Sequence, residues 1–242
     1  RVLFRSEAIS QHLRNQKDDG IRELYQYSQL LLALSVNEAR YATTATPLKY
    51  WQVWRELFGS QEAQAQVIEQ LKELKNKPLP REEQEALFAK HNKETQDFFH
   101  QRAQEEVLLV EQDLLLYYLC RKDRLLRLMQ YYTIFDNHIK KIARYQQFFA
   151  VEDTLARVKH IENGKRTGGV IWHTQGSGKS LTMVMLAQLL AVDKNIKHPK
   201  LLLVTDRTDL DKQISETFKK CNLPVVKAST GTNLTELLRE RT

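Results

Sequence analysis

The sequence predicts an α/β fold whose C-terminal part is a parallel sheet built around a phosphate-binding loop. A short apolar run at 170–172, bounded by glycines, is typical of a buried strand, and residues 179–191 have the apolar spacing of a helix. The loop between them follows the pattern G-x-x-x-x-G-K-[ST], with His173 in place of the first glycine. Residues 200–207 and 210–221 repeat the order of strand and helix, which is the alternation of a parallel sheet.

The residue types of this loop suit the binding of a nucleoside triphosphate. Gly176 and Gly178 can take positive φ values, which turn successive N–H groups toward a phosphate. The helix that starts at Lys179 adds its positive N-terminal dipole, Lys179 would reach the β and γ phosphates, and Ser180 would ligate Mg²⁺. A Gly-Lys-Ser alone is often an ordinary helix start, but the strand before it and the helix after it favour a nucleotide site.

A second candidate feature lies 29 residues before Gly176, in a helix predicted over 139–151. Arg144, Gln147 and Ala150 are three residues apart, which places them on one helical face. A glutamine amide offers a donor and an acceptor that match the N6/N7 edge of adenine. Since Arg-x-x-Gln is common in helices, this interpretation depends on the loop downstream. The predicted nucleotide-binding set is Arg144, Gln147, Thr174, Gly176, Ser177, Gly178, Lys179 and Ser180.

The composition is that of a globular protein without a membrane segment. The 242 residues are 42% apolar and 28% charged, enough for one or two domains with a core. The longest apolar run, 114–120, is far shorter than the roughly 18 to 20 residues of a membrane span, and residues 1–11 lack the apolar region of a signal peptide. Cys120 and Cys221 suggest neither a zinc site nor a disulfide framework. The sequence thus predicts a cytoplasmic protein with no membrane partner.

The net charge of +7 is concentrated in one part of the chain. Residues 1–58 hold 8 basic and 6 acidic residues, residues 59–140 hold 12 and 14, and residues 141–242 hold 17 and 10. The excess therefore belongs to the part with the phosphate-binding loop. A basic domain suits a polyanion such as nucleic acid, although a lysine-rich solvated surface has the same composition.

The residues before the loop divide into two predicted parts. In residues 1–58 we expect a helix over 7–16, a buried strand within 29–36, and a helix whose aromatic face serves packing rather than base stacking, formed by Tyr50, Trp51, Trp54, Leu57 and Phe58. Residues 59–140 are expected to form a helical connector, with long helices over 82–102 and 107–129 and a break at 77–80. The last of these helices is apolar on most faces and should be buried.

Three motifs in order resemble one known family. Residues 144–151 read RYQQFFAV, residues 172–183 read WHTQGSGKSLTM, and residues 204–213 read VTDRTDLDKQ. Together they resemble the start of the motor in the R subunit of type I restriction–modification enzymes, which are superfamily 2 helicase-like DNA translocases. The resemblance implies that residues 141–242 are an incomplete first RecA-like motor lobe, that Gln147 reads adenine, and that Lys179 is a catalytic residue stabilising the transferred phosphate. It also implies that Thr205 and Arg207 contact DNA.

A weaker resemblance covers the front of the chain. Residues 6–16, 30–36 and 38–41 are similar to the part of the R subunit that follows its nuclease site, so residues 1–58 would be the tail of a nuclease-like α/β domain. The chain is then expected to be an internal fragment with little activity of its own. The implied cofactors are ATP and Mg²⁺, and the implied partners are double-stranded DNA and the methyltransferase and specificity subunits. Two alternatives stay open, namely another superfamily 2 DNA-dependent ATPase and a nucleotide-switched binding module without a motor.

Overall fold

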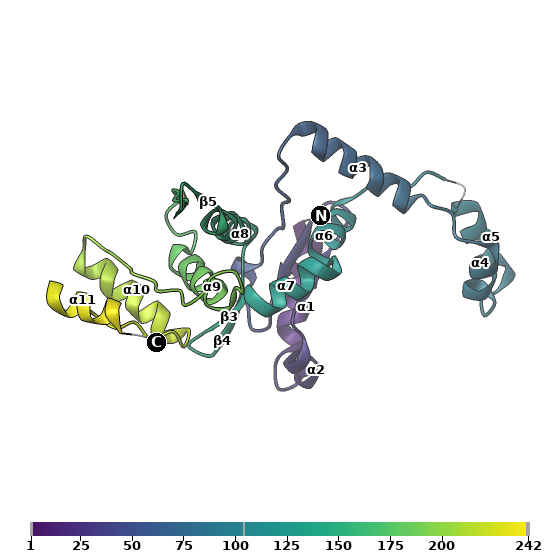
Figure 1. Ribbon diagram of the computed structural model, residues 1–242. Helices are drawn as coiled ribbons and strands as arrows, with labels where there is room; N and C mark the ends of the chain where they lie inside the picture. Colours follow the sequence, from purple (N-terminus) through teal and green to yellow (C-terminus); the bar gives the residue numbers. More distant parts are fainter. Residues whose placement is uncertain (1, 104, 241–242) are drawn as a thin grey trace.

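The computed structural model describes residues 2–103 and 105–240, and these form an elongated, mostly helical molecule with small sheets (Figure 1). The helices are α1 (Val2–Asn15), α2 (Arg22–Tyr27), η1 (Leu48–Tyr50, a 3-10 turn), α3 (Gln61–Lys75), α4 (Arg81–Phe88), α5 (Lys93–Arg102), α6 (Glu111–Cys120), α7 (Lys122–Tyr131), α8 (Tyr145–Lys159), α9 (Lys179–Val192), α10 (Thr208–Lys220) and α11 (Gly231–Arg239). The strands are β1 (Leu31–Leu34), β2 (Ala39–Ala42), β3 (Thr133–Asp136), β4 (Ile139–Ile142), β5 (Ile161–Glu162) and β6 (Lys165–Arg166).

The strands pair as three antiparallel hairpins. β1 pairs with β2, with Leu31 opposite Ala42, and this confirms the buried strand predicted within 29–36. β3 pairs with β4 across a two-residue turn in which Asn137 and His138 have φ values of 51° and 65°. Two consecutive positive φ values make the tight turn whose twist matches that of a hairpin. The third hairpin, β5 with β6, lies just before the phosphate-binding loop.

The predicted parallel sheet is not present among the described residues. Neither 170–172 nor 201–204 forms a strand, and the side chains of Val170, Trp172 and Val204 are 92%, 90% and 83% exposed. The apolar patterns at 170–172 and 201–204 are local properties of the two segments. A parallel strand, by contrast, forms only where neighbouring strands pair with it and helices cover both faces of the sheet. The described part of the chain places no further strand beside these two segments, so both stay extended and unpaired.

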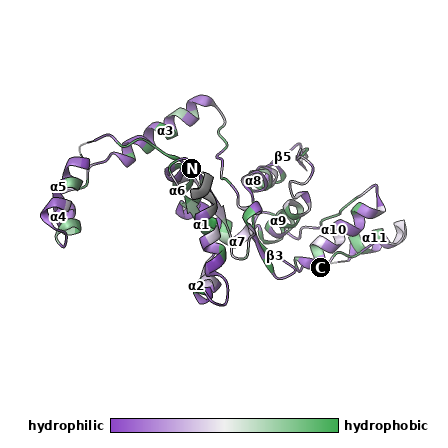
Figure 2. Ribbon diagram, turned by 180° about the vertical axis from the view of Figure 1, so that it is seen from behind, coloured by the Kyte–Doolittle hydropathy of each residue, from purple (hydrophilic) through white to green (hydrophobic). Residues whose placement is uncertain are grey.

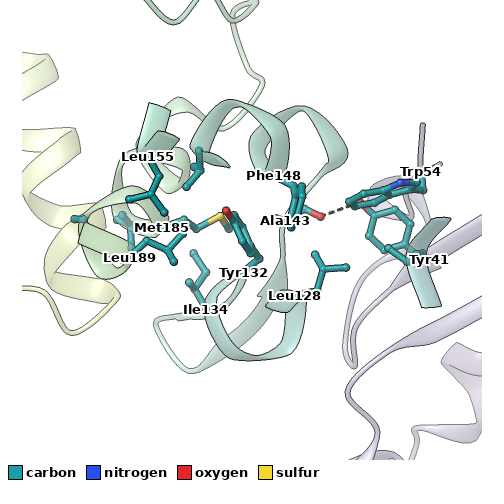
Figure 3. Close-up of a cluster of buried hydrophobic side chains, with 14 of the residues drawn as sticks. Tyr41, Trp54, Leu128, Tyr132, Ile134, Ala143, Phe148, Leu155, Met185 and Leu189 are labelled. Atoms are coloured by element: carbon teal, nitrogen blue, oxygen red, sulfur yellow. Dashed lines mark hydrogen bonds between the residues drawn. The ribbon is translucent and has the colours of Figure 1, made fainter. Parts of the chain in front are cut away.

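One core joins the front of the chain to the helices around the loop (Figure 3). The ring of Tyr132 lies 4.5 Å from that of Phe148, and the Tyr41 hydroxyl donates to the Ala143 carbonyl at 2.8 Å. α8 packs along α9, whose buried face includes Val184, Met185 and Leu189. Residues from β2 and from the stretch after η1 therefore share a core with α7 to α10, and this core fixes the start of α8.

Several predicted helices have different limits in the structure. Residues 51–58 form no helix and contain only an isolated bridge at Gln52, although Trp51 and Trp54 are buried and serve packing as expected. The helix predicted over 139–151 begins only at Tyr145, because 139–142 pairs with β3 as β4. The long helix predicted over 107–129 is broken at Arg121, whose ψ of 137° lies outside the helical region.

Residues 59–140, predicted as a helical connector, contain α3 to α7 but also β3 and the start of β4, and α6, α7 and β3 contribute to the core. The part that extends from the rest of the molecule is α3 to α5 (Figure 1). α3 begins after Ser60, whose hydroxyl accepts from the Ala63 N–H, and α4 and α5 form a hairpin at its far end (Figure 1). Two helices thus replace the one predicted over 82–102. Figure 2 shows that this hairpin is mainly hydrophilic, whereas α9 carries mostly hydrophobic residues. Within the described residues, no helix combines the length and apolar character that crossing a bilayer would require.

Candidate nucleotide-binding site

The loop before α9 has the backbone conformation that a phosphate site needs. Gly176 and Gly178 have φ values of 77° and 86°, in the left-handed region that glycine enters without a steric penalty. Gly178 is also the N-cap of α9, and its carbonyl accepts from the N–H groups of Leu181 and Thr182 at 3.0 and 3.1 Å. The loop therefore feeds directly into a helix N-terminus, where backbone N–H groups and the helix dipole favour an anion.

Polar groups of the loop have few partners apart from the loop itself. The exposed Lys179 folds back, and its Nζ donates to the carbonyls of His173 and Thr174 at 3.1 Å each. The Ser177 hydroxyl and the Nδ1 atom of His173 are buried and have no hydrogen-bond partner among the described residues. Buried polar atoms are nearly always paired in native proteins, so these two suit a ligand that brings its own polar groups.

Gln147 is the residue that joins α8 to the loop. Its side chain is 4% exposed. The Oε1 atom accepts from the Arg144 N–H at 2.9 Å, which closes the first turn of α8, and Nε2 donates to the carbonyls of Gly178 at 3.1 Å and Ser177 at 3.4 Å. Arg144 is the N-cap of α8 and lies outside the helix, so the prediction that it shares a helical face with Gln147 and Ala150 is wrong. The Gln147 amide therefore forms hydrogen bonds both with the first turn of α8 and with the C-terminal end of the loop.

A cavity of about 480 Å³ opens beside this amide. Its lining includes four of the predicted residues, Arg144, Gln147, Ser177 and Gly178. This volume is within the range of about 300 to 1,000 Å³ that small-molecule sites occupy. The structure thus brings the glutamine and the end of the loop to one concave surface.

The other wall of the cavity was not predicted. It comes from the front of the chain and from β4, with Tyr41, Thr46, Pro47, Tyr50 and Lys140 among its residues. The Nζ atom of Lys140 donates to the Ser28 carbonyl and to Gln29 Oε1, and partial burial lowers the pKa of Lys140. No periodicity or motif connects residues 41–50 to a glutamine about a hundred positions later, so only the folded chain reveals this wall.

The remaining predicted residues lie outside the cavity lining. Thr174, Gly176 and Lys179 are on the exposed side of the loop, and Ser180 is half-buried in the first turn of α9. Thr205 lies in the extended stretch before α10, and Arg207 is the exposed N-cap of that helix. The structure therefore places the predicted nucleotide-binding residues at α8, at α9 and in the loop between them, and the two predicted DNA contacts just before α10.

Comparisons with known proteins agree with the predicted family. Residues 146–242 match the model of the SWI2/SNF2 ATPase family. The HindI endonuclease subunit of Haemophilus influenzae, a type I restriction enzyme, is 39% identical over 41% of this chain and 10% of its own length. A putative type I restriction enzyme endonuclease subunit of Methanocaldococcus jannaschii, MjaIXP, is 26% identical over 97% of this chain and 20% of its own length. No solved structure matches significantly.

The curated relatives of this chain are thus endonuclease subunits of type I restriction enzymes, as the three motifs predicted. The chain spans about a tenth to a fifth of the length of these relatives. The SWI2/SNF2 match, which includes Gln147 and the whole phosphate-binding loop, implies a helicase-like fold for the C-terminal part.

Proposed function

We propose that this chain, a relative of type I restriction endonuclease subunits, binds ATP with Mg²⁺ between the loop before α9 and the start of α8. The observation that carries the proposal is the Gln147 amide, which bonds to the loop at Gly178 and lines the cavity beside it. A structural glutamine needs no adjoining cavity, whereas a base-reading glutamine needs one. The unpartnered Ser177 hydroxyl in the same lining supports a ligand at this place.

Each residue of the site has a role that follows from its chemistry. An amide oxygen accepts two hydrogen bonds and an amide nitrogen donates two, so Oε1 of Gln147 keeps a lone pair for adenine N6 beside its bond from Arg144. Lys179 would exchange two weak carbonyl partners for the β and γ phosphates, where its charge stabilises the transferred group. The Ser180 hydroxyl would ligate Mg²⁺, and Thr174 and Gly176 would complete the loop around the phosphates.

In the whole protein, we propose that ATP binding drives translocation along double-stranded DNA and that cleavage occurs in a complex with methyltransferase and specificity subunits. The names of the relatives and the ATPase match support this reading. Residues 1–58 would be the tail of a nuclease-like domain, 59–140 the connector, and 141–242 the first motor lobe. The basic excess of 141–242, 17 basic against 10 acidic residues, suits DNA, with phosphate contacts from Thr205 and Arg207. The chain alone would hydrolyse little ATP.

A second candidate is a different superfamily 2 DNA-dependent ATPase, such as a remodelling enzyme. The SWI2/SNF2 match of 146–242 favours it, because that match covers the ATP site and says nothing about cleavage. The match of MjaIXP along 97% of the chain favours the restriction subunit instead, since it extends through the connector to the front.

The nucleotide site is tested by calorimetric titration of ATP and GTP, each with Mg²⁺, into the 242-residue chain and three variants. We expect Lys179→Ala to abolish binding and Gln147→Ala to abolish the preference for ATP over GTP. Gln146→Ala is the matched control, because Gln146 is exposed on the same helical turn and should leave both properties unchanged. Binding that persists in Lys179→Ala, or a chain without any preference for adenine, would refute the proposal.

A further inference from the structure

Arg124 is a buried charge close to the proposed site that the ATP chemistry leaves unexplained. It lies on α7, is 9% exposed, and is the only ionisable side chain classed as buried in the described part of the chain apart from tyrosine and cysteine. Its guanidinium donates twice to Glu56, Nη1 to Oε2 at 3.1 Å and Nη2 to Oε1 at 2.9 Å. Glu56 Oε2 also accepts from the Trp54 indole N–H at 2.9 Å, so both partners are held in one geometry.

The same guanidinium is surrounded by aromatic rings. Its central carbon lies 4.7 Å from the centre of the Phe148 ring, 5.2 Å from Trp54 and 5.3 Å from Phe149. These distances are within the range of cation–π attraction. Burying an ion pair costs desolvation energy that its own attraction barely offsets, so such a pair is weak evidence of added stability. The arrangement fits better with fixing where these rings lie.

Two of the three rings around Arg124, those of Phe148 and Phe149, are close to Gln147 in the chain. Phe148 follows Gln147 directly in the first turn of α8, and successive helical residues have fixed relative directions. A loss of packing around Phe148 that lets the first turn of α8 rotate would lengthen or break the bond from Gln147 Nε2 to the Gly178 carbonyl. Other contacts also hold this turn, among them the Tyr132 ring, 4.5 Å from that of Phe148, and the bond from the Tyr41 hydroxyl to the Ala143 carbonyl.

We propose that Arg124 and Glu56 are positioning residues for base selection at the ATP site. They hold Phe148 so that the Gln147 amide faces the loop and the cavity together, and adenine preference then depends on how residues 54–56 pack against α7. Neither residue lines the cavity, so neither touches the nucleotide. This inference rests on the proposed function, since it concerns the ATP preference of the same site.

A neighbouring ion pair provides the control. Arg127, one turn further along α7, is bonded through Nη2 to Glu152 of α8 at 2.9 Å and makes a second bond through Nε. This pair joins α7 to α8 directly with two hydrogen bonds, whereas Arg124 meets α8 through the Phe148 and Phe149 rings. Glu152 lies five residues beyond Gln147, and the Arg127 guanidinium lies over the Tyr131 ring instead of Phe148. A general weakening of the contact between α7 and α8 would lower the ATP preference in Arg127→Lys as well, whereas a loss confined to the Arg124 and Glu56 variants points to the positioning of Gln147.

The test measures the ratio of ATP to GTP affinity in Arg124→Lys, Glu56→Gln and Arg127→Lys, at a temperature where each variant is folded by circular dichroism. Arg124→Lys keeps the positive charge but loses the planar guanidinium, which makes the two bonds to Glu56. Glu56→Gln keeps the size and shape of the Glu56 side chain, so it provides a second test if Arg124→Lys fails to fold. We expect the ratio to fall about tenfold in the first two variants, the effect of a free-energy change of about 1.4 kcal/mol, and to stay within about twofold in Arg127→Lys. Adding Arg124→Lys to Gln147→Ala should lower the ratio no further.

Three outcomes would overturn the inference: an unchanged ratio in both Arg124→Lys and Glu56→Gln, an equal fall in Arg127→Lys, or losses that add to those of Gln147→Ala. If the unmodified chain shows no preference for ATP, the proposed function itself fails and this inference fails with it. The unmodified chain therefore distinguishes the two failures.

Discussion

Glycine at position 178 meets two structural demands, a left-handed backbone conformation and a close approach of the Gln147 side chain, and replacing it by alanine tests both. The φ of 86° lies in the left-handed region, and a Cβ built there would come within 2.6 Å of the Gln147 Nε2 atom. Gly176 has a similar φ of 77°, but a Cβ built there meets nothing within 4 Å. The two glycines thus share the conformational demand, and only Gly178 has the close approach.

The expected loss of stability in each variant follows from these two demands. Holding alanine in the left-handed region costs about 1 kcal/mol, which is the whole expected effect of Gly176→Ala. In Gly178→Ala the Gln147 side chain must also move away and lose its bonds to the loop, which adds about 1 kcal/mol. The total of about 2 kcal/mol corresponds to a fall of about 4 to 8 °C in the melting temperature of a chain of this size.

The assay is a double-mutant cycle by thermal and urea unfolding. In the background of Gln147→Ala the second demand is absent, so Gly178→Ala should there cost about as much as Gly176→Ala, close to 1 kcal/mol. The reasoning is refuted if Gly178→Ala is no more destabilising than Gly176→Ala in the unmodified background, or if its cost is the same with and without Gln147.

Further predictions concern charge, DNA and thiol chemistry. The Lys159 ammonium beside Asp193, at the end of α9, holds the pKa of that carboxyl below its ordinary value of 3.8. The stability this provides is present above pH 3.8 and is lost as the pH falls through the lower folded-state pKa, so Asp193→Asn should lower the melting temperature at pH 7 by more than it does below pH 3.8. Arg207→Ala should weaken binding to double-stranded DNA and reduce the slope of log affinity against log salt by about one, whereas Arg81→Ala, at the start of α4, should not. Burial raises the pKa of both thiols, and Cys221 at 6% exposure should react with a disulfide reagent more slowly than the half-buried Cys120.

The helices that the sequence predicted best are those with a local cause. α9 begins at Lys179, as expected, because Gly178 in the left-handed conformation ends the loop and an apolar helix follows. The buried strand at Leu31–Leu34 was also recognisable, since a short apolar run of this kind has few other solutions. In the candidate site, the loop motif pointed to Gly178, and the amide chemistry of Gln147 and its position before that loop pointed to Gln147. In the structure the Gln147 Nε2 atom lies 3.1 Å from the Gly178 carbonyl oxygen.

Features that depend on distant partners could not be derived in the same way. Residues 139–142 have a helical pattern but become β4, because the turn at Asn137 and His138 folds them back onto β3. Residues 51–58 have aromatic spacing that suits a helix, yet they form no helix, and Trp54 reaches Phe148 and Phe149 of α8. In both cases a tertiary contact outweighs the local preference, which is worth well under about 1 kcal/mol per residue.

The same reasoning explains why the site can have its shape without the predicted parallel sheet. The position of the loop depends on its two ends, and the C-terminal end is fixed to the helices, because Gly178 is bonded to Gln147 and continues into α9. The N-terminal end, at Trp172, is 90% exposed. The conformation of Gly176 to Gly178 is thus maintained by two packed helices, and α8 is fixed in turn by Tyr41 and by Arg124 with Glu56. It follows that substitutions in α8 should alter the loop more than substitutions at 170–172, which is the reverse of what a sheet-centred view of the sequence would predict.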